Sequence, residues 1–275
     1  MPNPLLLCTD LDRTLLPNGV QPESPGSRER FRQFVEGQHI TLVYVTGRDR
    51  SLVEQAIKCY LLPRPDLVIS DVGSKIYDLR QDEWQIWPDW EKEIQKDWGN
   101  YTHTRLRELF RDLNALQMQE QAKQNTHKLS YYLSLHTDHE PLLAEMQRRL
   151  LEHGIKASLI WSIDEPAGIG LLDVLPASAT KLHAIDFVRQ QLGFDIYQTV
   201  FSGDSGNDMP VLTSAIPSIL VANAAPTVRD SALAEARRAD NGDALYIARG
   251  GSAESNGNYS AGILEGIAHY HPELF

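Results

Sequence analysis

The stretch Leu5 to Thr14, LLLCTDLDRT, joins a short apolar run to two acidic residues. A continuous apolar run of this length is typical of a strand buried on both faces of a parallel sheet. Asp10 and Asp12 follow directly, where the carboxyl end of such a strand would lie. Ligands bind outside the carboxyl ends of strands in open parallel α/β sheets. The stretch therefore predicts both a fold class and the position of a site.

The chain on either side of its middle alternates between expected helices and expected buried strands. The first half predicts strands over 5–9, 40–45 and 66–70 and helices over 27–38 and 50–60. The second half predicts helices over 181–192 and 260–269, strands over 199–202 and 218–221, and a loop over 249–258 rich in Gly, Ser and Asn. This alternation indicates parallel α/β winding.

The pattern changes over residues 81–176. This segment predicts helices over 104–113 and 141–153 and strands over 129–135 and 156–163, without the strand–helix–strand rhythm. Such a mixture favours a smaller α+β domain inserted into the first. We expect an α/β fold with a doubly wound parallel-sheet core, Rossmann-like, from residues 1–80 and 177–275, and an inserted α+β domain over 81–176.

Composition excludes several functions. The 275 residues carry 37 acidic and 26 basic side chains, a net charge of −11, which argues against nucleic-acid binding because phosphate backbones demand basic surface. The apolar start lacks a basic segment and is broken by Asp10, and no run approaches the roughly 18 apolar residues of a membrane span. Two cysteines make no disulfide framework. We expect a cytoplasmic monomer that binds neither nucleic acid nor membrane.

Four groups of polar residues occur in order along the chain, three of them at expected strand ends. They are Asp10 with Asp12, Thr46 with Gly47, Lys181 at the start of a helix, and Gly203-Asp204-Ser205-Gly206-Asn207-Asp208. Each group alone has an ordinary explanation, since an Asp at a strand end is often a turn former and a helical Lys is often solvated. Together, in this order, they favour one shared site.

Phosphate-ester hydrolysis requires such a set of groups. A cation must offset the charge of the phosphoryl group, and Mg²⁺ prefers a few carboxylate oxygens, which Asp10, Asp204 and Asp208 can supply. The same metal favours an ionised, attacking carboxylate. A second carboxyl group two residues further on, that of Asp12, can protonate the leaving alkoxide.

The phosphoryl oxygens also need hydrogen-bond donors. The Thr46 hydroxyl, the Gly47 amide and the Lys181 ammonium can provide them.

With these motifs the chain resembles the haloacid dehalogenase (HAD) superfamily of phosphatases over nearly its whole length. The resemblance implies that Asp10 forms an aspartyl phosphate and that Asp12 acts as acid and then base. It further implies that Asn207 supports the phosphate site formed with Thr46 and Lys181. The implied magnesium ligands are Asp10, Asp204, Asp208 and the backbone carbonyl of Asp12.

Within the superfamily the chain is most similar to sucrose-phosphatase-like sugar phosphatases. That likeness is carried by DVGSKIY (71–77), HKLSYYL (127–133), GDSGND (203–208) and AGILEGIAHY (261–270). The insert resembles the cap domain that determines substrate specificity. By the two-residue period of a strand, Lys128, Ser130 and Tyr132 would project together toward a sugar. The alternative is that Lys128 is a charge at a solvated strand edge.

Arg13 and Lys75 depart from the pattern of these relatives. Both add positive charge, which either serves a substrate with an extra anionic group or is solvated. The favoured substrate is sucrose 6-phosphate. The alternatives are another sugar phosphate (of a glycosylglycerate, trehalose or an amino sugar), a phosphomutase reaction, and a non-catalytic phosphate-binding regulator. A sugar-phosphate synthase is a candidate partner.

Overall fold

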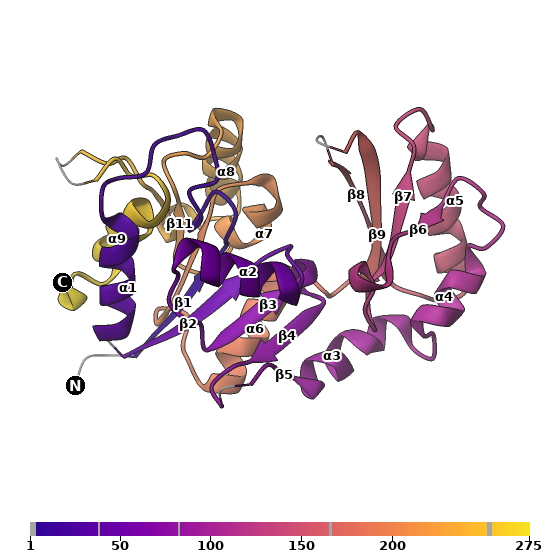
Figure 1. The fold of residues 1–275 in the computed structure, drawn as a ribbon, viewed down its shortest axis with the longest axis horizontal. Coiled ribbons are helices and arrows are strands. Elements are labelled where there is room, and N and C mark those ends of the chain that lie inside the picture. Colours follow the sequence, from indigo (N-terminus) through magenta and orange to yellow (C-terminus); the bar gives the residue numbers. More distant parts are fainter. Residues whose placement is uncertain (1–3, 38, 82, 165–166, 252–254) are drawn as a thin grey trace. The chain divides into compact units, whose positions relative to one another are not determined.

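The structure of the chain is a computed structural model that describes residues 4–37, 39–81, 83–164, 167–251 and 255–275. It divides into two compact units (Figure 1). The first unit combines Met1–Ile86 with Lys181–Phe275, and the second is Trp87–Thr180. The sequence pattern placed these boundaries at residues 81 and 176. Gln38, the expected end of a helix, and residues 252–254 of the expected loop lie outside the described residues.

The first unit is built on a sheet with the strand order β12-β11-β10-β1-β2-β3-β4-β5 among the described residues. Its strands are β1 (Leu5–Thr9), β2 (Ile40–Val45), β3 (Leu67–Ser70), β4 (Lys75–Asp78), β5 (Gln85–Ile86), β10 (Thr199–Gly203), β11 (Ser218–Leu220) and β12 (Leu245–Ile247). The strands from β12 to β3 are parallel, and β4 and β5 are antiparallel additions at one edge. Chain segments from both halves of the sequence therefore alternate within one sheet.

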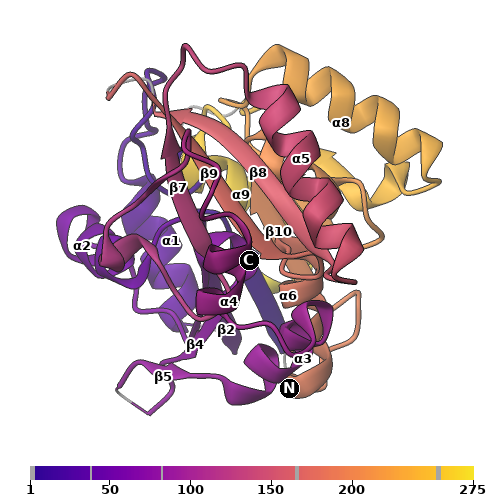
Figure 2. The same cartoon turned by 90° about the vertical axis from the view of Figure 1, so that its right-hand side faces the viewer.

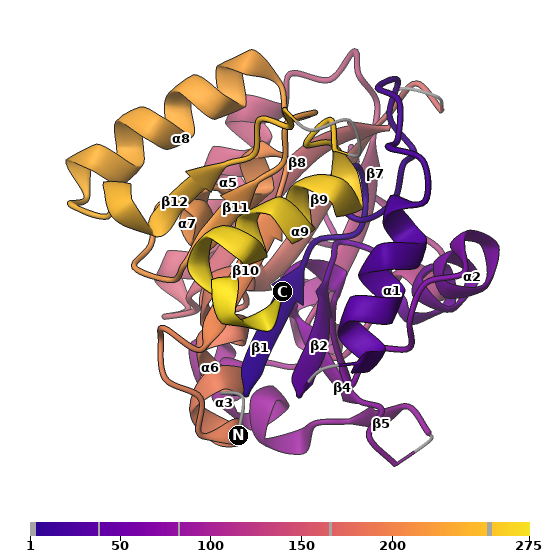
Figure 3. The ribbon, with the colours of Figure 1, turned by 90° about the vertical axis from the view of Figure 1, so that its left-hand side faces the viewer.

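Helices cover both faces of this sheet. They are α1 (Ser27–Gly37), α2 (Arg50–Tyr60), α6 (Lys181–Leu192), α7 (Met209–Leu212), α8 (Pro226–Arg238) and α9 (Tyr259–Tyr270). Helices α1, α2 and α9 share one apolar core with the strands, in which Phe31, Val53 and Ile263 are fully buried. Figure 3 shows α1 and α9 together in front of the sheet. Covered faces on both sides explain the all-apolar strand sequences.

The central strands bring the predicted site segments together. Thr9, the last residue of β1, pairs with Tyr44 of β2 on one side and with Ser202 of β10 on the other. The residues that follow these three strands therefore meet at one edge of the sheet. This register brings Thr9 next to residues that lie more than 30 and almost 200 positions further along the sequence.

The second unit is an α+β structure with its own core. It contains α3 (Pro88–Trp98), α4 (His103–Leu109), α5 (His139–Glu152) and the strands β6 (Gln117–Met118), β7 (Leu129–Leu133), β8 (Ala157–Asp164) and β9 (Ile169–Pro176). The strands form an antiparallel sheet in the order β6-β7-β9-β8. Figure 2 shows β7, β9 and β8 side by side, and α5 packs on β8. Trp98, Leu129 and Leu172 are buried between helices and sheet.

The fold class agrees with the expectation, whereas some element ends do not. The helix expected over 104–113 ends at Leu109, because Phe110 leaves the helical conformation and its backbone N–H closes a tighter turn onto Arg107. The strand expected to reach residue 135 ends at Leu133. These differences fall at element ends, where sequence periodicity carries little information.

Candidate active site

Asp10 lies directly after β1, at the meeting point of the central strands. Its backbone N–H donates to the carbonyl oxygen of Ser202 on β10, at 2.9 Å, which prolongs the parallel ladder by one residue. The residue as a whole is 5% exposed. The pairing of β1 with β2 and β10 thus fixes the backbone from which this carboxylate projects.

Lys181, the first residue of α6, joins three of the predicted site residues. Its Nζ donates to Asp208 Oδ1 at 2.7 Å, to Asn207 Oδ1 at 2.9 Å and to Asp10 Oδ1 at 3.0 Å. The side chain is 3% exposed. Although burial acts to lower the pKa of Lys181, the carboxylates of Asp10 and Asp208 outweigh it and raise that pKa above its usual value. The ammonium therefore stays charged.

The GDSGND segment is shaped around the carboxylate of Asp208. One oxygen of that carboxylate accepts the backbone N–H groups of Asp204 and Ser205, both at 3.1 Å. Its other oxygen faces Lys181. A Cβ at Gly203 would lie 2.6 Å from Asp208 Cγ, so no larger residue fits at that position. The turn holds Asp204 toward Asp10.

Asp10, Asp204 and Asp208 form a compact cluster of oxygen donors. One carboxylate oxygen from each lies within 4.8 Å of the others, and all three residues are buried. Thr14 Oγ1 donates to Asp204 Oδ1 at 3.2 Å. Burial first, and then the neighbouring carboxylates, raise the pKa of Asp10 to about 7 and that of Asp204 to about 6.

This donor set fits a magnesium ion. Mg²⁺ is bound by hard oxygen ligands, often one or two carboxylates with water. A divalent cation would also offset the mutual repulsion that raises both pKa values. The side chains offer oxygen atoms, and the nitrogen of Lys181 contacts the cluster from one side.

Asp12 is held by a residue that the sequence analysis did not single out. Arg48 makes a bidentate contact with its carboxylate, with Nε 2.7 Å from Oδ2 and Nη2 2.6 Å from Oδ1, and Asn18 donates to Oδ1 at 2.7 Å. Burial acts to raise the pKa of Asp12, but the bonds from Arg48 outweigh it and leave that pKa below its usual value. The only sequence signal for Arg48 was its place directly after Thr46 and Gly47.

Thr46 and Gly47 follow β2, next to the loop after β1. Thr46 is 1% exposed, and its Oγ1 accepts the backbone N–H of Arg48 at 3.2 Å. Asp49 then caps α2 by accepting the N–H of Leu52. Through Arg48 this turn is tied to Asp12, so the predicted phosphate-binding turn and the acidic loop are joined by a direct contact.

The two unusual basic residues have different surroundings. Arg13 has its Nε 3.5 Å from Asp204 Oδ2, and its side chain is 47% exposed. Lys75 begins β4 and is buried, at 5% exposure. Arg13 therefore lies beside the acidic cluster, and Lys75 is not a solvated surface charge.

Lys128, Ser130 and Tyr132 lie on and beside β7 of the second unit. Lys128 precedes the strand, is 8% exposed and has its Nζ 3.6 Å from Asp173 Oδ2. Ser130 Oγ donates to Asp173 Oδ1 at 2.5 Å, and the Tyr132 hydroxyl donates to Glu120. Leu129 and Tyr131 belong to the buried core, so Ser130 and Tyr132 share the opposite face of the sheet.

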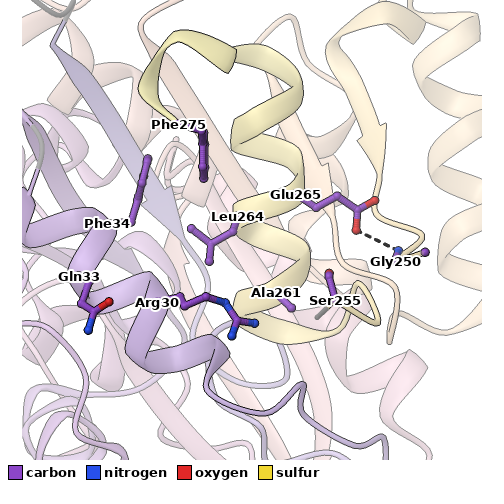
Figure 4. A pocket seen from close by; sticks show the side chains of 10 residues that line it. Arg30, Gln33, Phe34, Gly250, Ser255, Ala261, Leu264, Glu265 and Phe275 are labelled. Carbon is purple, nitrogen blue, oxygen red and sulfur yellow. Dashed lines mark hydrogen bonds between the residues drawn. The ribbon is translucent and has the colours of Figure 1, made fainter. Parts of the chain in front are cut away.

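The first unit contains a cavity of about 660 Å³. It is bounded by α1, α9 and residues near Gly250, with Phe34, Leu264 and Phe275 forming an apolar wall (Figure 4). Phe34 and Phe275 stack at 4.8 Å between ring centroids. None of the predicted site residues lines it.

Among the helices described, none combines the length and apolar content needed to cross a bilayer.

The family of sucrose-6F-phosphate phosphohydrolases matches residues 3–271. The chain belongs to this family. It is accordingly a sugar-phosphate phosphatase of the HAD superfamily, and it is similar to the sucrose-phosphatases. Of the motifs that carried the resemblance to the HAD superfamily, Asp10 with Asp12, Thr46 with Gly47 and the GDSGND segment follow β1, β2 and β10, and Lys181 at the start of α6 contacts Asp10.

Relatives of the chain include proteins with a general name and proteins named for one substrate. A protein of Nitrosococcus oceani with the general name HAD-like hydrolase is 50% identical, over 99% of this chain and 73% of that protein. The mannosylfructose-phosphate phosphatase of Agrobacterium fabrum is 26% identical over 96% of both. Sucrose-phosphatase 1 of Nicotiana tabacum is 27% identical over 97% of this chain, which spans 59% of the tobacco enzyme.

Solved structures agree with the architecture. The sucrose-phosphatase of Synechocystis, in complex with sucrose and phosphate, superposes with a TM-score of 0.72 at 25% identity, covering 98% of each chain. The HAD-like hydrolase yhjK of Bacillus subtilis superposes with a TM-score of 0.68 at 17% identity, over 96% of this chain and 91% of the other, and shows the shared fold. The expected HAD core with an added α+β unit is thus confirmed.

Proposed function

We propose that the chain hydrolyses the phosphate ester of a disaccharide, with sucrose 6-phosphate as substrate, Mg²⁺ as cofactor and phospho-Asp10 as intermediate. The observation that carries the proposal is the cluster of three buried carboxylates, Asp10, Asp204 and Asp208, two of which accept hydrogen bonds from the ammonium of Lys181. Buried charges of this density are costly unless a ligand uses them. A dianionic phosphoryl group with a divalent cation would complement this set of charges.

The first half of the reaction is attack by Asp10. One carboxylate oxygen bonds to phosphorus while the bond from phosphorus to the sugar oxygen breaks. Lys181 lies 3.0 Å from Asp10 and is oriented by Asn207 and Asp208, so its ammonium can bind a phosphoryl oxygen beside the nucleophile. The Thr46 hydroxyl and the Gly47 amide, which follow β2, supply further donors.

Magnesium is assigned to Asp10, Asp204, Asp208 and the backbone carbonyl of Asp12. When bound there it supplies positive charge that offsets the charges of the carboxylates and the phosphoryl group. Thr14 orients Asp204 through a bond to its Oδ1. The hydrogen bonds from the backbone N–H groups of Asp204 and Ser205 to Asp208 hold the carboxylate of Asp208 and the backbone of Asp204 in place.

Proton transfer is assigned to Asp12. Its carboxyl group gives a proton to the departing sugar oxygen, and the resulting carboxylate takes a proton from the water that then attacks phosphorus and releases Asp10. A carboxylate held ionised by two nitrogens of the Arg48 guanidinium has no proton to donate. Asp12 must therefore leave Arg48 when substrate binds, and the guanidinium becomes available to an anionic group.

Sugar selection is assigned to the second unit. The core groups recognise a phosphoryl group, which every sugar phosphate carries. Lys128 and Tyr132, with Asp173 and Glu120 beside them, form a polar face with donors and acceptors suited to sugar hydroxyls, and the fully buried Ser130 orients Asp173. The structure of the Synechocystis sucrose-phosphatase contains sucrose and phosphate, which supports a disaccharide as the leaving group.

A second candidate substrate is the phosphate ester of mannosylfructose. The Agrobacterium mannosylfructose-phosphate phosphatase matches this chain about as well as the tobacco sucrose-phosphatase does, at 26% and 27% identity. Both named substrates pair a hexose with fructose. The difference between them lies in the hexose, so the polar face of the second unit is the segment expected to distinguish them.

The test is phosphate release from a panel of sugar phosphates. The panel contains sucrose 6-phosphate, mannosylfructose phosphate, trehalose phosphate and a glycosylglycerate phosphate, each with Mg²⁺ and with excess chelator. We expect the highest kcat/KM for sucrose 6-phosphate, no release in chelator, and no need for a sugar-bisphosphate activator. A higher kcat/KM for trehalose phosphate or for the glycosylglycerate phosphate, or full activity in chelator, would contradict the proposal.

A further inference from the structure

Asn223 is a buried amide that lies outside the predicted motifs. It follows β11 and is 2% exposed. Its side chain reaches in two directions: Nδ2 donates to the carbonyl oxygen of Arg13 at 2.6 Å, and Oδ1 accepts the backbone N–H of Tyr259 at 2.9 Å. Arg13 is 210 residues away in sequence. The amide therefore joins the loop that carries the acidic motif to the first residue of α9.

Both residues that Asn223 contacts have an unfavourable backbone conformation. Arg13 has φ 60° and Tyr259 has φ 49°, in the left-handed region that residues with a side chain seldom adopt. Such conformations persist where the surroundings over-determine them, and they concentrate at functional sites. One carboxamide bonds the backbone of both residues, and its own position is fixed because Ala222 N–H donates to Gly257 O at 2.9 Å.

The left-handed turn at Arg13 sets the direction of its neighbours. Just before it, Asp12 has its carboxylate bonded to Asn18, and Asn18 in turn accepts the backbone N–H of Arg13 at 2.8 Å. Just after it, Thr14 donates to Asp204. If Arg13 changed from this positive φ to a common negative φ, the peptide planes on both sides of it would rotate. The Asp12 carbonyl and the Thr14 hydroxyl would then move together.

We propose that Asn223 is a positioning residue for phosphoryl transfer, which holds the Asp12–Thr14 backbone in its reactive geometry by bonding the Arg13 carbonyl. This inference rests on the function proposed above and adds a residue to it. Asn223 touches neither substrate nor metal in this assignment. Its effect passes through the Arg13 peptide, and so it falls on the chemical step more than on binding of the sugar.

The test compares Asn223→Ala with a matched control. Asn241 also donates through Nδ2 to a backbone carbonyl, that of Thr213 at 2.9 Å, in the same unit but away from the acidic loop. We expect Asn223→Ala to lower kcat roughly hundredfold, the size associated with a misplacement of about 1 Å, with KM changed less than about threefold. Asn241→Ala is expected to leave both constants within about twofold of the wild type.

Restoration by glycine separates positioning from a general loss of structure. Glycine adopts a positive φ without steric cost. If Asn223 acts by enforcing the left-handed turn, replacing Arg13 by Gly makes the amide less necessary. The fall in kcat caused by Asn223→Ala is therefore expected to be at least fivefold smaller in an Arg13→Gly background, in a double-mutant cycle.

Three results would overturn the inference: a kcat for Asn223→Ala within threefold of the wild type, an equal fall in the Arg13→Gly background, or a loss carried only by KM. Asn223→Asp keeps the acceptor for Tyr259 but loses the donor for Arg13, and it serves if Asn223→Ala does not fold. If neither variant folds, Asn223 serves the fold and the inference fails. An inactive wild type would instead contradict the proposed function.

Discussion

Replacement of Lys181 by Met tests how tightly the site depends on one buried cation. The ammonium contacts Asp10 and Asp208 at 3.0 and 2.7 Å, and both partners are buried. Methionine keeps most of the volume but leaves the buried carboxylates without their cation. Removing one partner of a buried ion pair costs about 3–5 kcal/mol, because the remaining charge is left uncompensated. We expect Lys181→Met to lower the free energy of unfolding by this amount when it is measured in excess chelator.

Hydrogen exchange at β1 and β10 is a suitable assay, because it reports the first unit without a contribution from the second. An exposed ion pair in the same unit provides the control: Arg32 and Glu29 on α1 have side chains 36% and 50% exposed. Arg32→Met is expected to leave the free energy of unfolding nearly unchanged, because water screens an exposed ion pair. Lys181→Met should also lower kcat by about 10²–10³, the loss typical of a group that stabilises transition-state charge. If both variants lost the same small amount of unfolding free energy, and Lys181→Met kept normal turnover, the proposed role of Lys181 would be refuted.

Three further variants test separate parts of the site. Asp12→Asn is expected to slow hydrolysis of a sugar phosphate far more than that of nitrophenyl phosphate, whose leaving group needs no proton; equal losses would mean that Asp12 is no general acid. Lys128→Ala is expected to lower kcat/KM for the sugar phosphate roughly ten- to hundredfold and leave nitrophenyl phosphate unchanged, and a common fall in both would remove this face from sugar binding. Gly203→Ala is expected to reduce stability by about 1–3 kcal/mol together with activity, because the added Cβ would lie 2.6 Å from Asp208 Cγ; unfolding and rate measurements equal to the wild type would contradict this.

The core of the fold was predictable because its strands are buried on both faces. The runs over 5–9 and 40–45 became β1 and β2 with the expected bounds. The helix over 50–60 was equally accurate, with Asp49 as its N-cap. In these segments apolar periodicity, capping and burial all indicate the same structure.

Other elements had no comparable signal. Helix α8 has a largely polar sequence, in which only Ala232 and Ala236 are buried, so it shows little apolar periodicity. Strand β9, at Ile169–Pro176, was not predicted, because it is a central strand whose eight residues all pair with β8 and five of which also pair with the distant β7. Such a strand is defined by its partners as much as by its own residues.

The acidic cluster was predictable because topology alone brings strand ends together. The contacts of Arg48 and Asn223 were not, since each depends on a side-chain conformation and on a partner 36 or 210 residues away. A single sequence contains no sign of which arginine or asparagine makes such a bond. The site was therefore predictable as a set of charges but not as a network.

The most direct measurement of the central claim is the capture of a phosphate group on Asp10. Rapid quenching during turnover, followed by borohydride reduction, would convert an aspartyl phosphate into homoserine, which mass spectrometry locates by residue. We expect homoserine at position 10 in the wild type only with Mg²⁺ and a sugar phosphate present, and neither homoserine nor turnover in Asp10→Asn. Undiminished turnover by Asp10→Asn, or modification at another carboxylate, would contradict the claim that Asp10 is the nucleophile.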